Sequence, residues 1–390
     1  QVLRSVPDTF DIILLNNPEP YTLNDNCLYT REFYRLLQSR LQPDGIFCFS
    51  IKSSENYLNP ALAEYTNLLV NSLQTVFHEL YIIPGDDQIF LASRNLDIAE
   101  RISGYPEILQ ASEIELQYFS GDYLAYRTSP ERLEQFQTDR HKRDHREWNS
   151  DLNLKGYLYH FRLWGAISDP GLVTFFNLMQ QYRWSIFLGL LLIFVIIHFV
   201  MVRRDRKLYL WNLLLVGGYS IGLEIVFLLE YQILFGTVYS TLAIIFGLFM
   251  LGLATGVLLT PESTTKLGKK KMERMIITGF IILCGILILP TLSPIYQAMS
   301  TLPVFLSEWI ISMLFIFLNG FLTGAFFSVV TSAIYREFPS TSSGLTYGVD
   351  LAGSVVASFS ISILLVPILE IRGLLLLLLI FMVIQRGWRK

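Results

Sequence analysis

The chain has 390 residues, of which 52% are hydrophobic and only 16% are charged. Soluble domains carry about 25% charged residues, so this balance indicates an integral membrane protein. The formal net charge of −3 gives no support to a nucleic-acid-binding role.

The beginning of the chain has the pattern of an α/β domain. Short apolar runs predict strands, and helical patterns alternate with them. This alternation predicts a doubly wound sheet, of which residues 1–104 supply the C-terminal part. The expected strands are Asp11–Leu15, Gly45–Lys52, Leu80–Pro84 and Gln88–Arg94, and the expected helices are Thr30–Leu41 and Pro60–Phe77.

Residues 105–183 are predicted to form a polar connector that ends in an interfacial helix. His141 and His145 are four residues apart, a spacing that suits a metal on one helix face, but the run around them is strongly charged and holds no third His or Cys. A solvated helix is therefore favoured over a metal site. His160, which stands between two aromatic residues, is interpreted as a packing residue.

Residues 184–390 contain the apolar stretches that account for the composition. A spanning helix needs about 20 mostly apolar residues. We predict an all-α polytopic bundle of about seven helices on this basis. The seven stretches are Trp184–Val202, Leu208–Leu229, Val238–Leu259, Met275–Leu289, Val304–Tyr335, Gly344–Leu369 and Gly373–Ile384.

Positive charges gather in alternate loops of this part. Residues 203–207 and 266–274 are rich in Lys and Arg, and the chain ends on RGWRK, whereas the loops near 230–237 and 290–303 contain neither residue type. Positively charged short loops stay cytoplasmic. The pattern predicts a cytoplasmic C-terminus and an extracytoplasmic α/β part. We expect a multi-pass protein of a plasma membrane, namely a bacterial inner membrane.

Three polar residues, Glu224, Gln232 and Asp350, fall within or beside the apolar stretches. Polar groups inside a membrane are costly, so these residues are functional candidates. They could bind a cation, relay protons or line a substrate path. We favour a structural role instead, in which Glu224 and Asp350 form hydrogen bonds across helices, for example to Asn319 or Tyr347.

Two GxxxG pairs, Gly252 with Gly256 and Gly320 with Gly324, predict close approach between helices. The three cysteines, Cys27, Cys48 and Cys284, show no CxxC or metal-ligand spacing, so we expect neither a disulfide scaffold nor a metal site. The opening QVLRSVPDTF, without Met or a signal peptide, predicts a processed or truncated N-terminus.

Several motifs together resemble the spermidine synthase (polyamine aminopropyltransferase) family, most closely its membrane-embedded relatives. The resemblance implies that this chain is the C-terminal portion of such a protein, with a partial Rossmann-like (methyltransferase-like) domain before its membrane helices. The motifs are DIILLNNPEP, LYTREFYRLLQSRLQPDGIF, SPERLEQF, WNSDLNLKGYLYHFRLW, GLEIVFLLEYQILFGTVYSTLAIIFGLFMLGLATG, NGFLTGAFF and LTYGVDLAGSVVAS.

The resemblance also bears on catalysis. Soluble members carry an acidic loop D-S-[ST]-D-P, in which one Asp takes a proton from the amine nucleophile and the other helps to hold the cationic end of the polyamine. The matching loop here is residues 16–20, NNPEP. Asn16 stands in place of the base, and an amide cannot accept a proton at neutral pH, which removes a contribution of about 10²–10⁴-fold. Glu19 keeps a carboxylate and is the candidate polyamine- or cation-binding residue.

These observations predict an integral membrane accessory or scaffold protein with a degenerate, non-catalytic domain. Its expected partners are the lipid bilayer and another protein chain or a missing N-terminal half, and no cofactor is expected. One alternative is an active aminopropyltransferase completed by that missing half, which would use decarboxylated S-adenosylmethionine. Another is a transporter or cation-binding membrane protein that uses Glu224 and Asp350.

Overall fold

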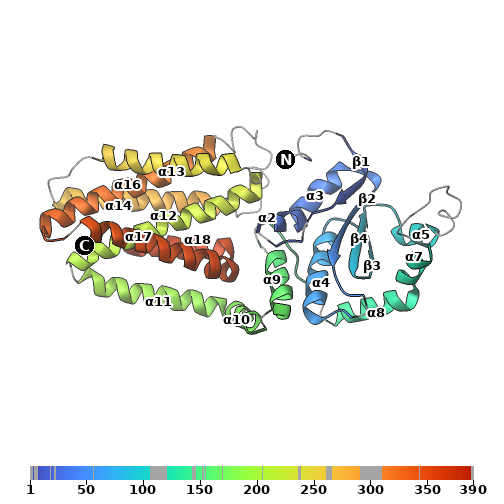
Figure 1. The fold of residues 1–390 in the computed structure, drawn as a ribbon. Coiled ribbons are helices and arrows are strands. Elements are labelled where there is room, and N and C mark those ends of the chain that lie inside the picture. The colour runs from blue at the N-terminus through green and yellow to red at the C-terminus, as the bar shows by residue number, and fades with distance from the viewer. Residues whose placement is uncertain are drawn as a thin grey trace. The chain divides into compact units, whose positions relative to one another are not determined.

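The computed structural model describes most of the chain in two compact units, Gln1–Thr174 and Phe175–Lys390 (Figure 1). The boundary falls inside helix α10 (Pro170–Gln181). The described residues are 3, 8–17, 19–21, 23–55, 57–105, 121–142, 146–151, 153, 155–168, 170–203, 205–235, 239–260, 266–289, 310–341 and 343–387.

The first unit is built on a four-stranded mixed sheet with the strand order β1-β2-β4-β3. β1 and β2 are parallel, and β4 is antiparallel to both of its neighbours. The expected α/β class is therefore confirmed as a small mixed sheet. The strands are β1 (Phe10–Leu15), β2 (Leu41–Lys52), β3 (Glu79–Ile83) and β4 (Asp87–Ser93).

Two helices connect the strands. Helix α3 (Arg31–Arg40) joins β1 to β2, and its Thr30 N-cap hydroxyl accepts from the Phe33 N–H. Helix α4 (Pro60–Gln74) joins β2 to β3, with Asn59 as its N-cap and Pro60 in its first turn. Caps of this kind satisfy N–H groups that a helix start leaves without partners, so both starts were readable from the sequence.

The core of this unit lies on the sheet face that these helices cover. Phe47, Phe49 and Phe90 are almost fully buried there, together with Tyr34 of α3 and Tyr65 of α4. The Phe49 and Phe90 rings stack with centroids 4.7 Å apart across β2 and β4. Aromatic pairs of this size dominate core energetics, so this face holds the unit together.

The opposite side of β1 has little cover. Ile13 and Leu15 pack against the core, whereas the alternate residues Ile12 and Leu14 are 68% and 67% exposed. β1 is also the edge strand of the sheet among the described residues. The unit therefore presents an edge strand whose open face carries two exposed apolar side chains.

The remaining elements of the first unit surround the sheet and include residues of the expected connector. Arg127 is buried, and its guanidinium donates to the backbone carbonyls of Ile83, Pro84 and Asp87, which fixes the turn between β3 and β4. These elements are α2 (Leu23–Asn26), η1 (Cys27–Tyr29), α5 (Ile98–Ser103), α7 (Gly121–Arg127), α8 (Pro130–His141) and α9 (Lys155–Ser168).

The second unit is helical throughout its described part (Figure 1). Its elements are α11 (Arg183–Val202), α12 (Asp205–Phe235), α13 (Tyr239–Leu259), α14 (Lys266–Ile288), α16 (Ser312–Glu337), α17 (Ser343–Phe359), the π-helix η4 (Ser360–Leu365) and α18 (Val366–Gly387).

Five helices among the described residues are long and apolar enough to span a membrane, compared with the seven that we expected. They are Arg183–Val202, Lys207–Ile233, Thr241–Leu259, Ser312–Glu337 and Ser343–Gly387. The fourth expected stretch lies in α14, whose first turns carry several charged residues. Residues 304–309 of the fifth, and the loop 290–303, lie outside the described part.

The sixth and seventh expected stretches form one helical run, Ser343–Gly387. Forty-five residues of helix would extend about 67 Å, more than twice the thickness of a bilayer core. The run is broken at Glu370, whose φ of 60° and ψ of 169° are not helical. The break lies between the two expected stretches, so their separation is confirmed although no loop divides them.

Both GxxxG pairs lie where α13 and α16 meet. A Cβ added to Gly252 would be 2.2 Å from the Phe317 carbonyl oxygen, and one added to Gly324 would be 2.1 Å from the Leu253 carbonyl oxygen. No side chain fits at such positions, so the glycines allow the two backbones to touch. The predicted close approach occurs within the bundle.

Candidate functional site

The acidic loop of the sequence motif follows β1 at the end of the sheet where the carboxyl ends of β1 and β2 meet. In α/β sheets, ligands bind outside the carboxyl ends of the strands. Asn16 and Asn17 are exposed there, whereas Glu19 is only 6% exposed. The intervening Pro18 lies outside the described residues. The loop thus exposes the side chains of Asn16 and Asn17 to solvent, whereas the Glu19 carboxylate is buried.

Glu19 is held by two groups of this chain. The backbone N–H of Lys52, the last residue of β2, donates to its Oε1. His160 of α9 places Nε2 2.8 Å from Oε2, and this imidazole is 2% exposed. Both carboxylate oxygens are engaged, so Glu19 does not present a free oxygen to an incoming ammonium group.

The proton on His160 follows from its neighbours. The Trp164 indole nitrogen also lies 2.9 Å from His160 Nε2, and an indole N–H can only donate. A nitrogen that donates to Glu19 cannot accept from Trp164 as well. We assign the proton to the Glu19 contact, because a hydrogen bond to a carboxylate is the stronger of the two. Trp164 is then a packing contact.

Aromatic rings enclose this pair. The Tyr21 ring meets His160 edge-on at 4.7 Å, and the Tyr65 ring lies 5.7 Å from it. Burial, with the Glu19 carboxylate as the second cause, raises the pKa of the Tyr65 phenol well above its usual value. The phenol therefore stays protonated and cannot serve as a base. An aromatic box with a carboxylate suits a cation, but His160 already fills it.

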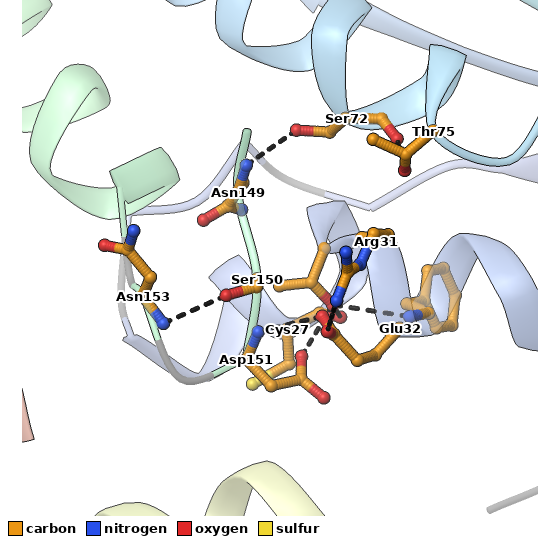
Figure 2. Close-up of polar contacts among 11 residues, drawn as sticks. Cys27, Arg31, Glu32, Ser72, Thr75, Asn149, Ser150, Asp151 and Asn153 are labelled. Carbon is orange, nitrogen blue, oxygen red and sulfur yellow. Dashed lines mark hydrogen bonds and ion pairs between the residues drawn. The ribbon is translucent and has the colours of Figure 1, made fainter. Parts of the chain in front are cut away.

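A second polar network lies beside this site and ties residues 149–153 to the start of α3 (Figure 2). The Thr30 hydroxyl donates to Asp151 Oδ1 at 2.6 Å, and the Asp151 N–H donates to Glu32 at 3.1 Å. Asn149 is fully buried, and its amide donates to the Asn26 side chain at 2.9 Å. The segment acts as a structural clip.

Cys27 belongs to the same region and is not a nucleophile. Burial, followed by the nearby Asp151 carboxylate, raises the pKa of its thiol far above the usual value. A thiol reacts as the thiolate, so Cys27 is inert at neutral pH.

Of the other residues singled out in the sequence, His141 is exposed, and His145 lies outside the described part.

The polar residues of the bundle are buried to different degrees. Glu224 in α12 is 3% exposed, whereas Gln232 in α12 and Asp350 in α17 are half-buried. Asp350 packs against the backbone of α12 at Gly217. The Asn319 amide donates to the Ser220 carbonyl at 3.1 Å, and Tyr347 is 59% exposed.

Sequence comparisons give little direct information on identity. No protein-family model matches the chain. A segment of 114 residues is 33% identical to the putative aquaporin NIP4-1 of Arabidopsis thaliana, which covers 28% of this chain and 39% of that protein. The chain therefore matches less than half the length of this curated relative.

Proposed function

We propose that this chain is an accessory subunit of a membrane complex, in which a degenerate aminopropyltransferase-like unit binds another protein and transfers no group. The five apolar helices make it a multi-pass membrane protein. The positive charge of alternate loops supports an orientation with the α/β unit outside the cytoplasm, and we propose a bacterial inner membrane as its location.

The strand order supports a partial Rossmann-like identity for the sheet. Two crossovers, through α3 and α4, connect strands β1, β2 and β3, which share one direction. β4 then returns antiparallel between β2 and β3. Helical crossovers between parallel strands are the building unit of doubly wound folds.

The observation that carries the non-catalytic role is the engagement of Glu19. Aminopropyl transfer needs a carboxylate that accepts a proton from the amine. Asn16 supplies only an amide at the position of the base, and Glu19 is closed off by His160 and the Lys52 N–H. The loop therefore keeps its place at the end of the sheet, but it has neither a carboxylate base nor a free carboxylate that could hold the cationic end of a polyamine.

The open edge of β1 supports the binding role. Exposed strand edges with apolar side chains pair readily with another polypeptide. Ile12 and Leu14 supply that apolar surface. A strand added to β1 would extend the sheet, and its side chains would pack beside Ile12 and Leu14 on the same face.

The experiment has two arms, both on the full chain in lipid nanodiscs or native membranes. Incubation with putrescine or spermidine and decarboxylated S-adenosylmethionine is expected to give no aminopropyl product, for the wild type and for Asn16→Asp. The Ile12→Lys/Leu14→Lys double variant is expected to shift the chain from a larger complex to a smaller one on native gels.

Tyr57→Lys is the matched control for the second arm, because Tyr57 is an exposed ring of the same unit at 64% exposure. It is expected to leave the complex unchanged. Product formation by the wild type would refute the non-catalytic role and restore the active transferase with its cofactor. A complex that resists the double variant would refute binding through β1.

A second candidate function is transport or cation binding by the membrane bundle. The partial similarity to an aquaporin supports it weakly, because the matched segment covers only 39% of that protein. The buried Glu224 supports it more specifically, since an ionisable side chain inside the membrane marks ion or substrate sites.

A further inference from the structure

Helices α12 and α16 carry four buried polar residues, three in direct contact and the fourth, Glu224, one helical turn from Ser220 on α12. The Ser220 and Thr323 hydroxyl oxygens are 2.6 Å apart, and the Asn319 amide donates to the Ser220 carbonyl at 3.1 Å. All members are at most 6% exposed. The cluster, Ser220, Glu224, Asn319 and Thr323, lies wholly within the second unit.

Two acceptor groups of this cluster have no partner among the described residues. Asn319 Oδ1 is buried and receives no hydrogen bond. The Glu224 carboxylate likewise shows neither a hydrogen bond nor an ion pair within that part of the chain. Leaving such groups unsatisfied in an apolar environment costs several kcal/mol, so the two groups need either a proton on Glu224 or a bound cation.

The backbone places these two groups close together. The Ser220 carbonyl, to which the Asn319 amide donates, is the one that pairs with the Glu224 N–H in the helix. Side chains on a helix lean toward its N-terminus, so Glu224 leans toward Ser220. One turn further along, Phe227 stacks on Phe315 at 5.0 Å, which shows that α12 and α16 run antiparallel here.

Glu224 and Asn319 therefore lie at one level, between the Ser220–Thr323 contact and the Phe227–Phe315 stack. Carboxylate, amide and hydroxyl oxygens are all acceptors, and together they form an oxygen-only ligand set. Hard cations prefer such ligands. A single carboxylate balances a single positive charge.

We propose that this cluster binds one Na⁺ between the Glu224 carboxylate and Asn319 Oδ1, with the Ser220 and Thr323 hydroxyl oxygens as further ligands. The other carboxylates of the bundle belong to different positions. Asp350 packs at Gly217, about 10 Å along α12 from Glu224, and Glu230 is about 9 Å away in the other direction. Neither is needed for the site.

The test is equilibrium binding of radiolabelled sodium to the purified full chain in nanodiscs, above neutral pH and after long equilibration, because the cluster is closed to solvent. The wild type is expected to bind one Na⁺ per chain saturably. Glu224→Gln keeps the shape of the side chain and is expected to abolish binding, while Ser220→Ala lowers the affinity by about tenfold.

Glu230→Gln and Asp350→Asn are matched controls, since each removes one carboxylate from the same bundle, and both are expected to bind like the wild type. Absence of saturable binding by the wild type would overturn the proposal. Binding by Glu224→Gln with wild-type affinity would also overturn it. If Glu224→Gln does not fold, wild-type affinity in Ser220→Ala would count against the ligand set in the same way.

Discussion

Two buried carboxylates of each unit differ in the partners that they have within the described part of the chain. In the α/β unit, Glu19 and Asp151 are both buried and both accept hydrogen bonds from this chain's own groups. In the helical unit, Glu224 and Glu230 are equally buried, yet Glu230 Oε1 and the Glu224 carboxylate lack partners among the described residues.

The presence or absence of internal partners indicates whether a buried carboxylate has a structural or a ligand-binding role. A buried carboxylate with complete internal partners stabilises a fold, whereas one without them needs something from outside. In the loop that resembles an enzyme site, residues 16–20, the Glu19 carboxylate is therefore already occupied by groups of this chain. The polar cluster within the bundle is the one with an unfilled requirement.

The largest effect is expected from His160→Ala. Removing the imidazole leaves the buried Glu19 carboxylate without its side-chain partner, and an uncompensated buried charge costs roughly 3–5 kcal/mol. Denaturant unfolding of the full chain, followed by hydrogen exchange of the β1 and β2 amides, measures this loss. His141→Ala, at an exposed position, should change stability by about 0.5 kcal/mol or less. Equal effects would show that the pair is not structural.

The next effect concerns the packing of the bundle. Gly324→Ala puts a methyl group 2.1 Å from the Leu253 carbonyl oxygen and is expected to destabilise the bundle by about 1–3 kcal/mol. Thermal unfolding in nanodiscs measures it. Gly247→Ala is the matched control, because nothing lies within 4 Å of the added methyl group. A tolerated Gly324→Ala would contradict the close approach of α13 and α16.

The structural clip of the first unit predicts a similar or slightly smaller effect. Gly156→Ala would place a Cβ 2.2 Å from Asn26 Oδ1, so the Asn26–Asn149 pair must move. The expected cost is about 1–2 kcal/mol, read as faster hydrogen exchange at the start of α3. Gly104→Ala, whose added methyl group would meet only ordinary contacts at 3.9 Å or more, should leave exchange there unchanged.

The smallest effect is a pH dependence in the alkaline range. The pKa of the Tyr65 phenol is raised by burial above its unfolded value of about 10, so the folded state keeps a proton that the unfolded state loses. Stability is full below about pH 10 and falls as the pH rises further. Tyr65→Phe should reduce this fall in pH-dependent unfolding. An unchanged slope would show that Tyr65 ionises in the folded protein.

Much of the first unit followed from the sequence because its signals are local. The strands are short apolar runs, and the expected helices began at Thr30 and Pro60, next to the observed starts of α3 and α4. The role of His160 did not follow, because its partner Glu19 is 141 positions away and two aromatic neighbours suggested simple packing. The aromatic setting was predicted correctly, but the hydrogen bond to Glu19 was missed.

The helical unit shows the same limit. Apolar length predicted seven spans, of which the described part shows five. The small-residue spacing predicted a close approach of helices, which the structure shows between α13 and α16. The sequence predicted two separate stretches on either side of Glu370. It did not predict that a single residue with non-helical φ and ψ would divide them, because no residue type at that position marks such a break. Asn319 was expected as a cross-helix partner of Glu224 because of its residue type alone. In the structure the Asn319 amide donates to the Ser220 carbonyl instead.

The most direct test of the closed loop is an experimental structure of the full chain in the presence of spermidine and decarboxylated S-adenosylmethionine. We predict that Glu19 still contacts His160, at about the 2.8 Å seen here, and that neither compound occupies the loop after β1. An amine bound to the Glu19 carboxylate, with His160 displaced and a sulfonium nucleoside beside Asn16, would contradict the account.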